Sequence, residues 1–155
     1  SLFATFDTIT GSTDAPLPIM PVLDFDGSAQ DEHMDWYVTM PSHYDGGGLT
    51  FSYKFAMTGT DAQAVEMEFR CRKYVTNSSV ISGDIDITGA TAAVQATASP
   101  QVANEFTQSA AIGLSHSNAG SPAAGDRLII RVTRDYDHEA NTDDLQLLEV
   151  LVLET

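Results

Sequence analysis

The chain has 155 residues, with 22 Asp and Glu against 7 Lys and Arg, and its formal net charge is -15. This charge excludes the class of proteins that bind their partners through clusters of Lys and Arg side chains. Nucleic acids and anionic membranes are bound by such clusters, so we expect neither as a partner. A hydrophobic content of 43% can fill the core of one domain, and the single cysteine, Cys71, excludes an intramolecular disulfide.

The first 21 residues predict an extended arm rather than a central strand. Pro16, Pro18 and Pro21 lack backbone donors and favour extended geometry at a sheet edge. We therefore expect an arm over residues 1–21 and one β-sandwich domain over residues 22–155. The arm could lie across its own domain or bind a neighbouring subunit, and in the second case its apolar side chains are the partner-binding residues: Phe3, Phe6, Ile9, Leu17 and Ile19.

The same segment bears on where the protein is made. The first twenty residues contain no Lys or Arg and no continuous apolar run, and the sequence has no 18-residue apolar segment. We expect a protein without a signal peptide, made in the cytoplasm.

Alternating apolar and polar residues predict strands through most of the remaining sequence. The clearest case is AVEMEFRCRKY, residues 64–74, in which every second side chain from Val65 to Cys71 is apolar. Residues 90–98 could be a helical turn or a strand. Residues 145–153 are apolar on nearly both faces, which is typical of a strand deep in the fold. The expected strands are 22–25, 34–40, 49–57, 64–74, 104–112, 128–134 and 145–153.

About eight strands without a long helix predict an all-β protein, an antiparallel two-sheet sandwich and most simply a jelly roll with an extended N-terminal arm. The alternation also predicts which side chains face the core. Glu66, Glu68 and Arg131 should be exposed. The following should be buried: Trp36, Phe51, Phe55, Phe69, Cys71, Ile130, Val132 and Leu147.

The seven cationic residues are grouped at Lys54, at residues 70–73 and at residues 127–134. The simpler interpretation places them on the solvated faces of three strands. The alternative is a patch that meets an acidic surface of another subunit.

The segment DYDHEANTD, residues 135–143, places oxygen-bearing side chains at alternate positions. Calcium loops use this spacing, but their sixth position requires Gly and their twelfth Glu, and here these are Ala140 and Gln146. We favour a solvated acidic hairpin loop. The alternative is a calcium site formed by Asp135, Asp137, Glu139, Asn141 and Asp143.

No spacing selects a catalytic site. Cupin-type enzymes bind metal through a His-x-His pair, whereas here no two histidines lie within four residues of each other. No Gly-x-Ser-x-Gly elbow is present. Cys71 lies on the apolar face of its strand, which favours a buried structural thiol. We therefore expect a protein that is not an enzyme and has no cofactor and no bound transition metal.

Two segments resemble a group of small structural proteins of tailed bacteriophages. In the first, Asp24 to Met57, a strand that ends at Pro41 precedes a Tyr-Asp-Gly-Gly turn and an aromatic-rich strand. In the second, Ala124 to Leu153, an Arg134-Asp135 strand terminus leads through an acidic loop to a final apolar strand.

The resemblance implies a head decoration or cement protein that sits on the outside of the capsid, commonly as a homotrimer, with the major capsid protein as its partner. It places the protein in the virion. The competing hypothesis is a carbohydrate- or receptor-binding module of a tail or fibre, because Tyr37, Tyr44 and the loop over residues 41–48 could form an aromatic sugar platform. Trp36 is in register with apolar neighbours, so we expect it in the core instead.

Overall fold

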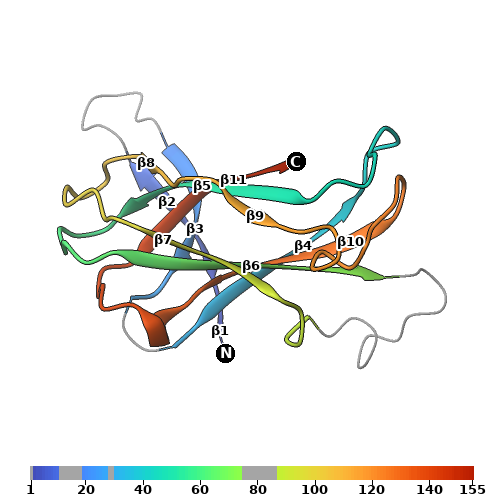
Figure 1. Cartoon of the computed structure of the whole chain (residues 1–155). Helices are drawn as coiled ribbons and strands as arrows, with labels where there is room; N and C mark the ends of the chain where they lie inside the picture. The colour runs from blue at the N-terminus through green and yellow to red at the C-terminus, as the bar shows by residue number, and fades with distance from the viewer. Residues whose placement is uncertain (1, 11–18, 28–29, 75–86) are drawn as a thin grey trace.

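The structure is a computed structural model that describes residues 2–10, 19–27, 30–74 and 87–155 (Figure 1). Its strands are β1 (Leu2–Phe3), β2 (Thr5–Thr10), β3 (Ile19–Phe25), β4 (Glu32–Thr39), β5 (Leu49–Met57), β6 (Val65–Tyr74), β7 (Ala92–Thr97), β8 (Thr107–Gln108), β9 (Ile112–Leu114), β10 (Arg127–Arg134) and β11 (Leu145–Glu154). One turn of 3-10 helix, η1 (Tyr136–His138), follows β10.

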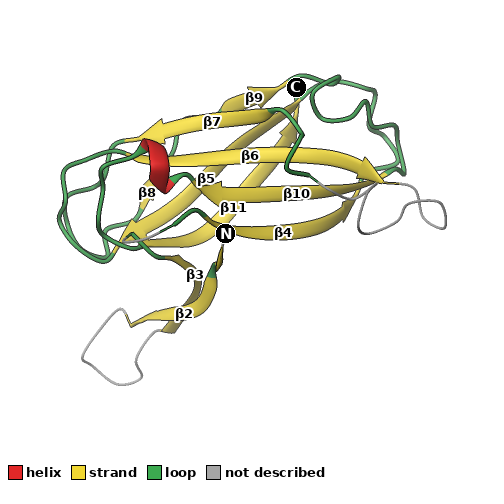
Figure 2. Ribbon diagram, turned by 90° about the horizontal axis from the view of Figure 1, so that it is seen from below, coloured by secondary structure: helices red, strands yellow, loops and turns green. Residues whose placement is uncertain are grey.

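The strands form two sheets that pack face to face (Figure 2). Sheet A has the order β1-β4-β10-β6-β7, and sheet B has the order β2-β3-β11-β5-β8, with β9 also paired to β5. All neighbouring strands are antiparallel except the short β1, which runs parallel to β4. The all-β, antiparallel two-sheet fold predicted from the sequence is therefore confirmed.

The alternation in residues 64–74 forms the expected strand. In β6, Val65, Met67, Phe69 and Cys71 are buried, and the residues between them are partly exposed. The ladder with β10 places Val132 beside Phe69 in the same sheet. Since both strands direct their apolar side chains to the same face of sheet A, that face becomes half of the core.

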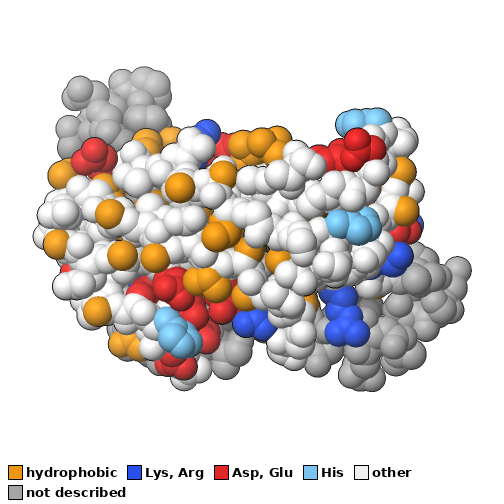
Figure 3. Space-filling model, viewed as in Figure 1, with side chains coloured by type: hydrophobic (Ala, Val, Ile, Leu, Met, Phe, Trp, Pro, Cys, Tyr) orange, Lys and Arg blue, Asp and Glu red, His pale blue; other side chains and the backbone are white. Residues whose placement is uncertain are grey.

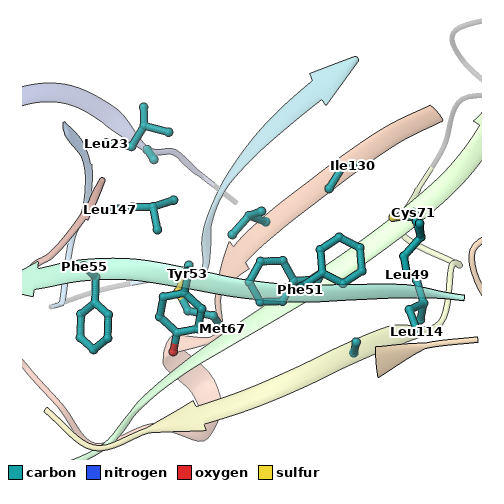
Figure 4. Close-up of a cluster of buried hydrophobic side chains, with 14 of the residues drawn as sticks. Leu23, Leu49, Phe51, Tyr53, Phe55, Met67, Cys71, Leu114, Ile130 and Leu147 are labelled. Atoms are coloured by element: carbon teal, nitrogen blue, oxygen red, sulfur yellow. The ribbon is translucent and has the colours of Figure 1, made fainter. Parts of the chain in front are cut away.

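The other half of the core comes from β5. Figure 4 shows Phe51 and Tyr53 of β5 close to side chains of the opposite sheet, such as Met67. The rings of Phe51 and Phe69 stack across the sandwich with their centroids 5.1 Å apart. Seven of the eight side chains predicted to be buried are buried: Phe51, Phe55, Phe69, Cys71, Ile130, Val132 and Leu147.

The eighth, Trp36, is only half-buried, because β4 lies beside an open edge of the sandwich. Glu66, Glu68 and Arg131 were predicted to be exposed and are also half-buried. Two of them lie in ion pairs on the outer face of sheet A: Glu68 with Arg70 at 2.7 Å and Arg131 with Asp35 at 2.7 Å. Long side chains paired in this way cover part of one another.

The described part of the N-terminal segment belongs to both sheets. β1 pairs with β4 in sheet A, and β2 pairs with β3 in sheet B. The boundary expected after residue 21 falls inside β3, so residues 19–21 continue a strand of the domain. Ala4, between β1 and β2, is buried in the main core. The segment is thus an edge element of the sandwich as well as an extension from it.

The last strand departs from the sequence expectation. Leu145 and Leu147 are buried, but from Glu149 onward β11 alternates between exposed and half-buried side chains. The ladder between β11 and β5 shifts register between Leu147 and Glu149, and β3 pairs with β11 only up to Leu147. The second half of β11 is therefore an edge strand, and its apolar composition does not mean that it lies in the core.

Candidate functional site

The β2–β3 hairpin stands away from the body of the sandwich. β2 pairs with β3 along its whole length, from Thr5 opposite Asp24 to Thr10 opposite Ile19. β3 reaches β11 only through Leu23 to Phe25. The outer part of the hairpin therefore has no further strand beside it among the described residues, and Figure 2 shows it projecting from the two sheets.

The two faces of this hairpin differ in burial. On one face, Ile9 and Val22 are buried against Ala56 of β5. On the other face, Phe6 is 82% exposed and Ile19 is 64% exposed. Exposed aromatic and branched side chains on one face of a projecting hairpin are unusual for a monomer and are typical of a contact surface.

Three of the five predicted partner-binding residues are in a position to contact a partner. Phe3, Phe6 and Ile19 are exposed, and the ring of Phe3 lies 4.7 Å from the ring of His33 on the outer side of sheet A. Ile9 is a correction, because it is 6% exposed and contacts its own chain. Leu17 lies outside the described residues.

An open flank adjoins the hairpin. Beyond Leu147, β11 has only β5 beside it, and beyond His33, β4 has only β10 beside it among the described residues. Both sheets therefore end on the same side of the sandwich with an unpaired strand edge. Such edges offer free backbone donors and acceptors to another strand.

The space between these two edges is apolar. It is a hollow of about 380 Å³ lined chiefly by Trp36, Val38, Ile130, Val150 and Val152. A second hollow of about 280 Å³ continues beside Trp36 to Phe6 and Pro21 of the hairpin. The exposed face of the hairpin and the open flank thus form one continuous apolar surface, which we call the assembly surface.

The cationic side chains lie elsewhere. Six of the seven belong to β6 and β10 of sheet A: Arg70, Arg72, Lys73, Arg127, Arg131 and Arg134. Arg131 makes two hydrogen bonds to Asp35, of 2.7 and 2.8 Å, and Lys73 lies 3.3 Å from Asp126. The interpretation as solvated strand faces agrees with this arrangement, except that Arg134 is fully buried.

Arg134 organises the acidic loop that follows it. Its guanidinium forms a buried ion pair with Glu139 and donates hydrogen bonds to the carbonyl oxygens of Phe25, Asn141 and Asp143. These contacts fold the loop back over the end of the sandwich. The Glu139 carboxylate and the carbonyl oxygens of Asn141 and Asp143 are therefore bound by a cation that the chain itself supplies.

The five residues of the possible calcium loop do not converge on one point. Glu139 faces Arg134, and Asp135 faces His138 at 2.8 Å. The Asn141 amide donates to the Gln63 carbonyl at 2.7 Å, and Asp143 accepts a hydrogen bond of 2.7 Å from the Asp61 amide. Asp137 is exposed.

The close packing of this loop requires a glycine at position 27, just after β3. A Cβ on Gly27 would lie 2.4 Å from the carbonyl oxygen of Asp143. The backbone of Thr142 and Asp143 leaves no room for a side chain there, so this end of the loop is packed against the domain, whereas Asp137 remains in solvent.

The aromatic residues proposed for sugar binding are separated. Tyr44 is 6% exposed, donates a hydrogen bond to the Gly47 carbonyl and lies 3.2 Å from His116 Nδ1. It closes the loop over residues 41–48 instead of presenting a ring. Tyr37 is 64% exposed and packs edge-on against Tyr74, with ring centroids 5.8 Å apart. The structure does not bring Tyr37 and Tyr44 together as a platform.

The thiol and the histidines form no catalytic arrangement among the described residues. Cys71 is buried, and burial raises the pKa of its thiol to about 12, so it carries no thiolate at neutral pH. Burial also lowers the pKa of His33. His43 is exposed in the loop after β4, and His116 contacts Tyr44.

A group of carboxylates lies at the base of the hairpin. Asp24 in β3 has a pKa of about 6, above its ordinary 3.8, because burial and then the nearby Asp144 and Asp7 disfavour its charged form. Its Oδ1 accepts no hydrogen bond from the described residues, and neither does Oε1 of Gln146, its cross-strand neighbour in β11. A protonated Asp24 could donate to that oxygen.

We predict that Asp24→Asn stabilises the protein at neutral pH. The folded-state pKa of Asp24 is raised, so its stabilising contribution is complete below pH 3.8 and is lost as the pH rises through about 6. After discounting for solvent at this half-exposed side chain, the gain in unfolding free energy at pH 7.5 should be about 1 kcal/mol. Urea unfolding of both proteins at pH 7.5 and pH 4.5 measures it, and the difference should shrink at the lower pH. An equal effect of Asp137→Asn, at an exposed site, would contradict the prediction.

Sequence reasoning identified Phe6 and Ile19 as apolar residues of an extended arm, but it predicted neither the β2–β3 hairpin nor the open flank. The apolar run in β11 suggested a central strand, and only the pairing of β3 shows that half of it is an edge. Comparisons of the sequence with protein-family models and with curated proteins found no match. Among the described residues, no helix is long and apolar enough to cross a membrane.

Proposed function

We propose that the chain is a non-enzymatic structural protein of a phage virion, a decoration or cement protein that binds the outside of the capsid lattice and stabilises it. The observation that carries the proposal is the assembly surface, on which exposed Phe6 and Ile19 adjoin two unpaired strand edges. A module that stays monomeric would expose this surface to water at a cost in free energy.

The order of the strands supports the same proposal. Leaving aside β1 and β2, the sheets run β3-β11-β5-β8 and β4-β10-β6-β7. From β3 onward the chain changes sheet at every connection except β6–β7 and β8–β9. We interpret this order as the two Greek keys of a jelly roll, an architecture that is common in capsid proteins.

Charge gives the proposal a second support. A net charge of -15 suits a surface turned away from packaged nucleic acid, and it makes free copies repel one another. We propose that the protein forms homotrimers on the capsid, with the apolar hairpin face against the neighbouring copy or the major capsid protein. Because salt screens the repulsion, sedimentation velocity should show more association at high salt than at low salt.

The experiment that tests the proposal is co-sedimentation with undecorated capsids, assembled from the major capsid protein of the same phage. We expect the full chain to bind and the variant Phe6→Ser/Ile19→Ser to bind at least about tenfold more weakly, because two buried apolar anchors are lost. Its unfolding free energy should stay within about 0.5 kcal/mol of the parent, since both side chains are exposed in the free protein.

A matched control is Val102→Ser/Phe106→Ser, which removes two exposed apolar side chains from the loop before β8 and should leave binding unchanged. Equal capsid binding by the hairpin variant would refute the assembly surface. Saturable binding of the full chain on a glycan array, with no capsid binding, would favour the carbohydrate-binding module instead.

A further inference from the structure

Three side chains that can bind metal meet on the outer face of sheet A, at the end where β10 leaves the sheet. They are Glu66 of β6, Asp135 after β10 and His138 of η1, and one ligand atom of each lies within 4.8 Å of the others. Figure 3 shows Asp and Glu side chains gathered beside a histidine on this part of the surface, at the lower left. The assembly surface does not include these residues.

The backbone fixes two of the three positions. The Asp135 amide donates a hydrogen bond of 3.0 Å to the Glu66 carbonyl, which extends the β6–β10 ladder by one residue. The Glu66 amide in turn donates to the carboxylate of Glu139, which is paired with the buried Arg134. The loop is therefore anchored on both sides of His138, and the three ligands sit on a rigid frame.

This frame places two carboxylates beside each other across neighbouring strands. Like charges in that arrangement destabilise a sheet unless something compensates them. The nearby arginines are engaged elsewhere: Arg134 points into the core and is paired with Glu139, and Arg70 is paired with Glu68. On its other side Glu66 faces Ala96 of β7, which brings no charge.

His138 forms a hydrogen bond with only one of the two carboxylates, that of Asp135. Its Nδ1 lies 2.8 Å from both oxygens of Asp135. The half-buried Glu66 carboxylate lies beside this pair. A half-buried carboxylate, a nearly buried carboxylate and an exposed imidazole thus offer two oxygen ligands and one nitrogen ligand to a cation.

We propose that Glu66, Asp135 and His138 form a binding site for a divalent transition metal of the zinc class. One imidazole nitrogen and two carboxylate oxygens suit Zn²⁺, with water completing a tetrahedron. Ca²⁺ requires six to eight oxygen ligands, which three side chains on this frame do not provide. Two ligands of a zinc tetrahedron lie about 3.3 Å apart, so His138 Nδ1 would move away from its present 2.8 Å contact with Asp135 when a metal binds. His138 is exposed and Glu66 is half-buried, so both side chains can rotate to the required positions.

A metal at this point would tie the start of β6, the end of β10 and the η1 turn together. Binding to the folded state alone stabilises it by mass action, so the melting temperature should rise with zinc concentration. The proposal does not rest on the virion function, and the two can fail independently.

The test is isothermal titration calorimetry of ZnCl₂ into the full chain, expressed without a histidine tag and treated with EDTA. We expect one zinc per chain and a rise in melting temperature. The exposed His138→Ala and the conservative Glu66→Gln should each weaken zinc binding at least about tenfold and remove most of that rise. His43→Ala, at an exposed histidine in another loop, is the matched control and should bind zinc like the parent.

Several outcomes would overturn the site. The parent protein could bind no zinc saturably, or both ligand variants could bind zinc as tightly as the parent. Loss of binding in His43→Ala would place the metal elsewhere. Saturable Ca²⁺ binding that zinc cannot displace would show that the carboxylates serve an oxygen-only site instead.

Discussion

Replacing Arg134 with Met should reduce the unfolding free energy by about 3–5 kcal/mol, as expected when one partner of a buried ion pair is removed. Both side chains of the pair are almost inaccessible, at 0% for Arg134 and 1% for Glu139. The substitution leaves Glu139 charged or protonated in a dry site. It also removes the donor from the carbonyl oxygens of Phe25, Asn141 and Asp143, each of which then loses a hydrogen bond.

Urea unfolding followed by circular dichroism measures this loss. Lys54→Gln is the matched control, because Lys54 forms an exposed ion pair with Glu149 and its removal should cost less than about 1 kcal/mol. The double variant Arg134→Met/Glu139→Leu should recover part of the loss, since no charge is then left unpaired. A cost for Arg134→Met as small as that for Lys54→Gln would mean that the loop opens and exposes Glu139 to water.

Truncating Phe69 to Ala should also reduce the free energy of unfolding, by about 3–5 kcal/mol. Phe69 is fully buried at the centre of the sandwich, stacks on Phe51 at 5.1 Å and lies 5.9 Å from the ring of Tyr53. Three aromatic rings from two sheets are held in one cluster, so the surrounding side chains cannot collapse into the space without moving both sheets.

The same unfolding measurement applies, with Phe106→Ala as the control. Phe106 is 53% exposed, so its truncation should change the unfolding free energy by less than about 0.5 kcal/mol. If Phe69→Ala cost no more than Phe106→Ala, the two sheets would not share the packed core described above.

Much of the fold could be predicted from local patterns, because in a half-buried strand every second side chain faces the core and is apolar. Residues 64–74 and 128–134 show this: both became neighbouring strands with the expected side chains inside. Phe6 and Ile19 were predicted to bind a partner from an extended arm, since prolines restrict that segment to an edge, and in the structure both side chains are exposed.

The sequence by itself determined the class of fold, the buried faces of β5, β6 and β10 and the inert character of Cys71, because these follow from periodicity and composition. The tertiary structure alone decided which strands are edges, so the apolar second half of β11 lies at an open flank rather than in the centre. It also decided that Arg134 is buried and that Glu66 meets Asp135 and His138. Those contacts join residues far apart in the chain, and their geometry depends on sheet pairing that no local pattern specifies.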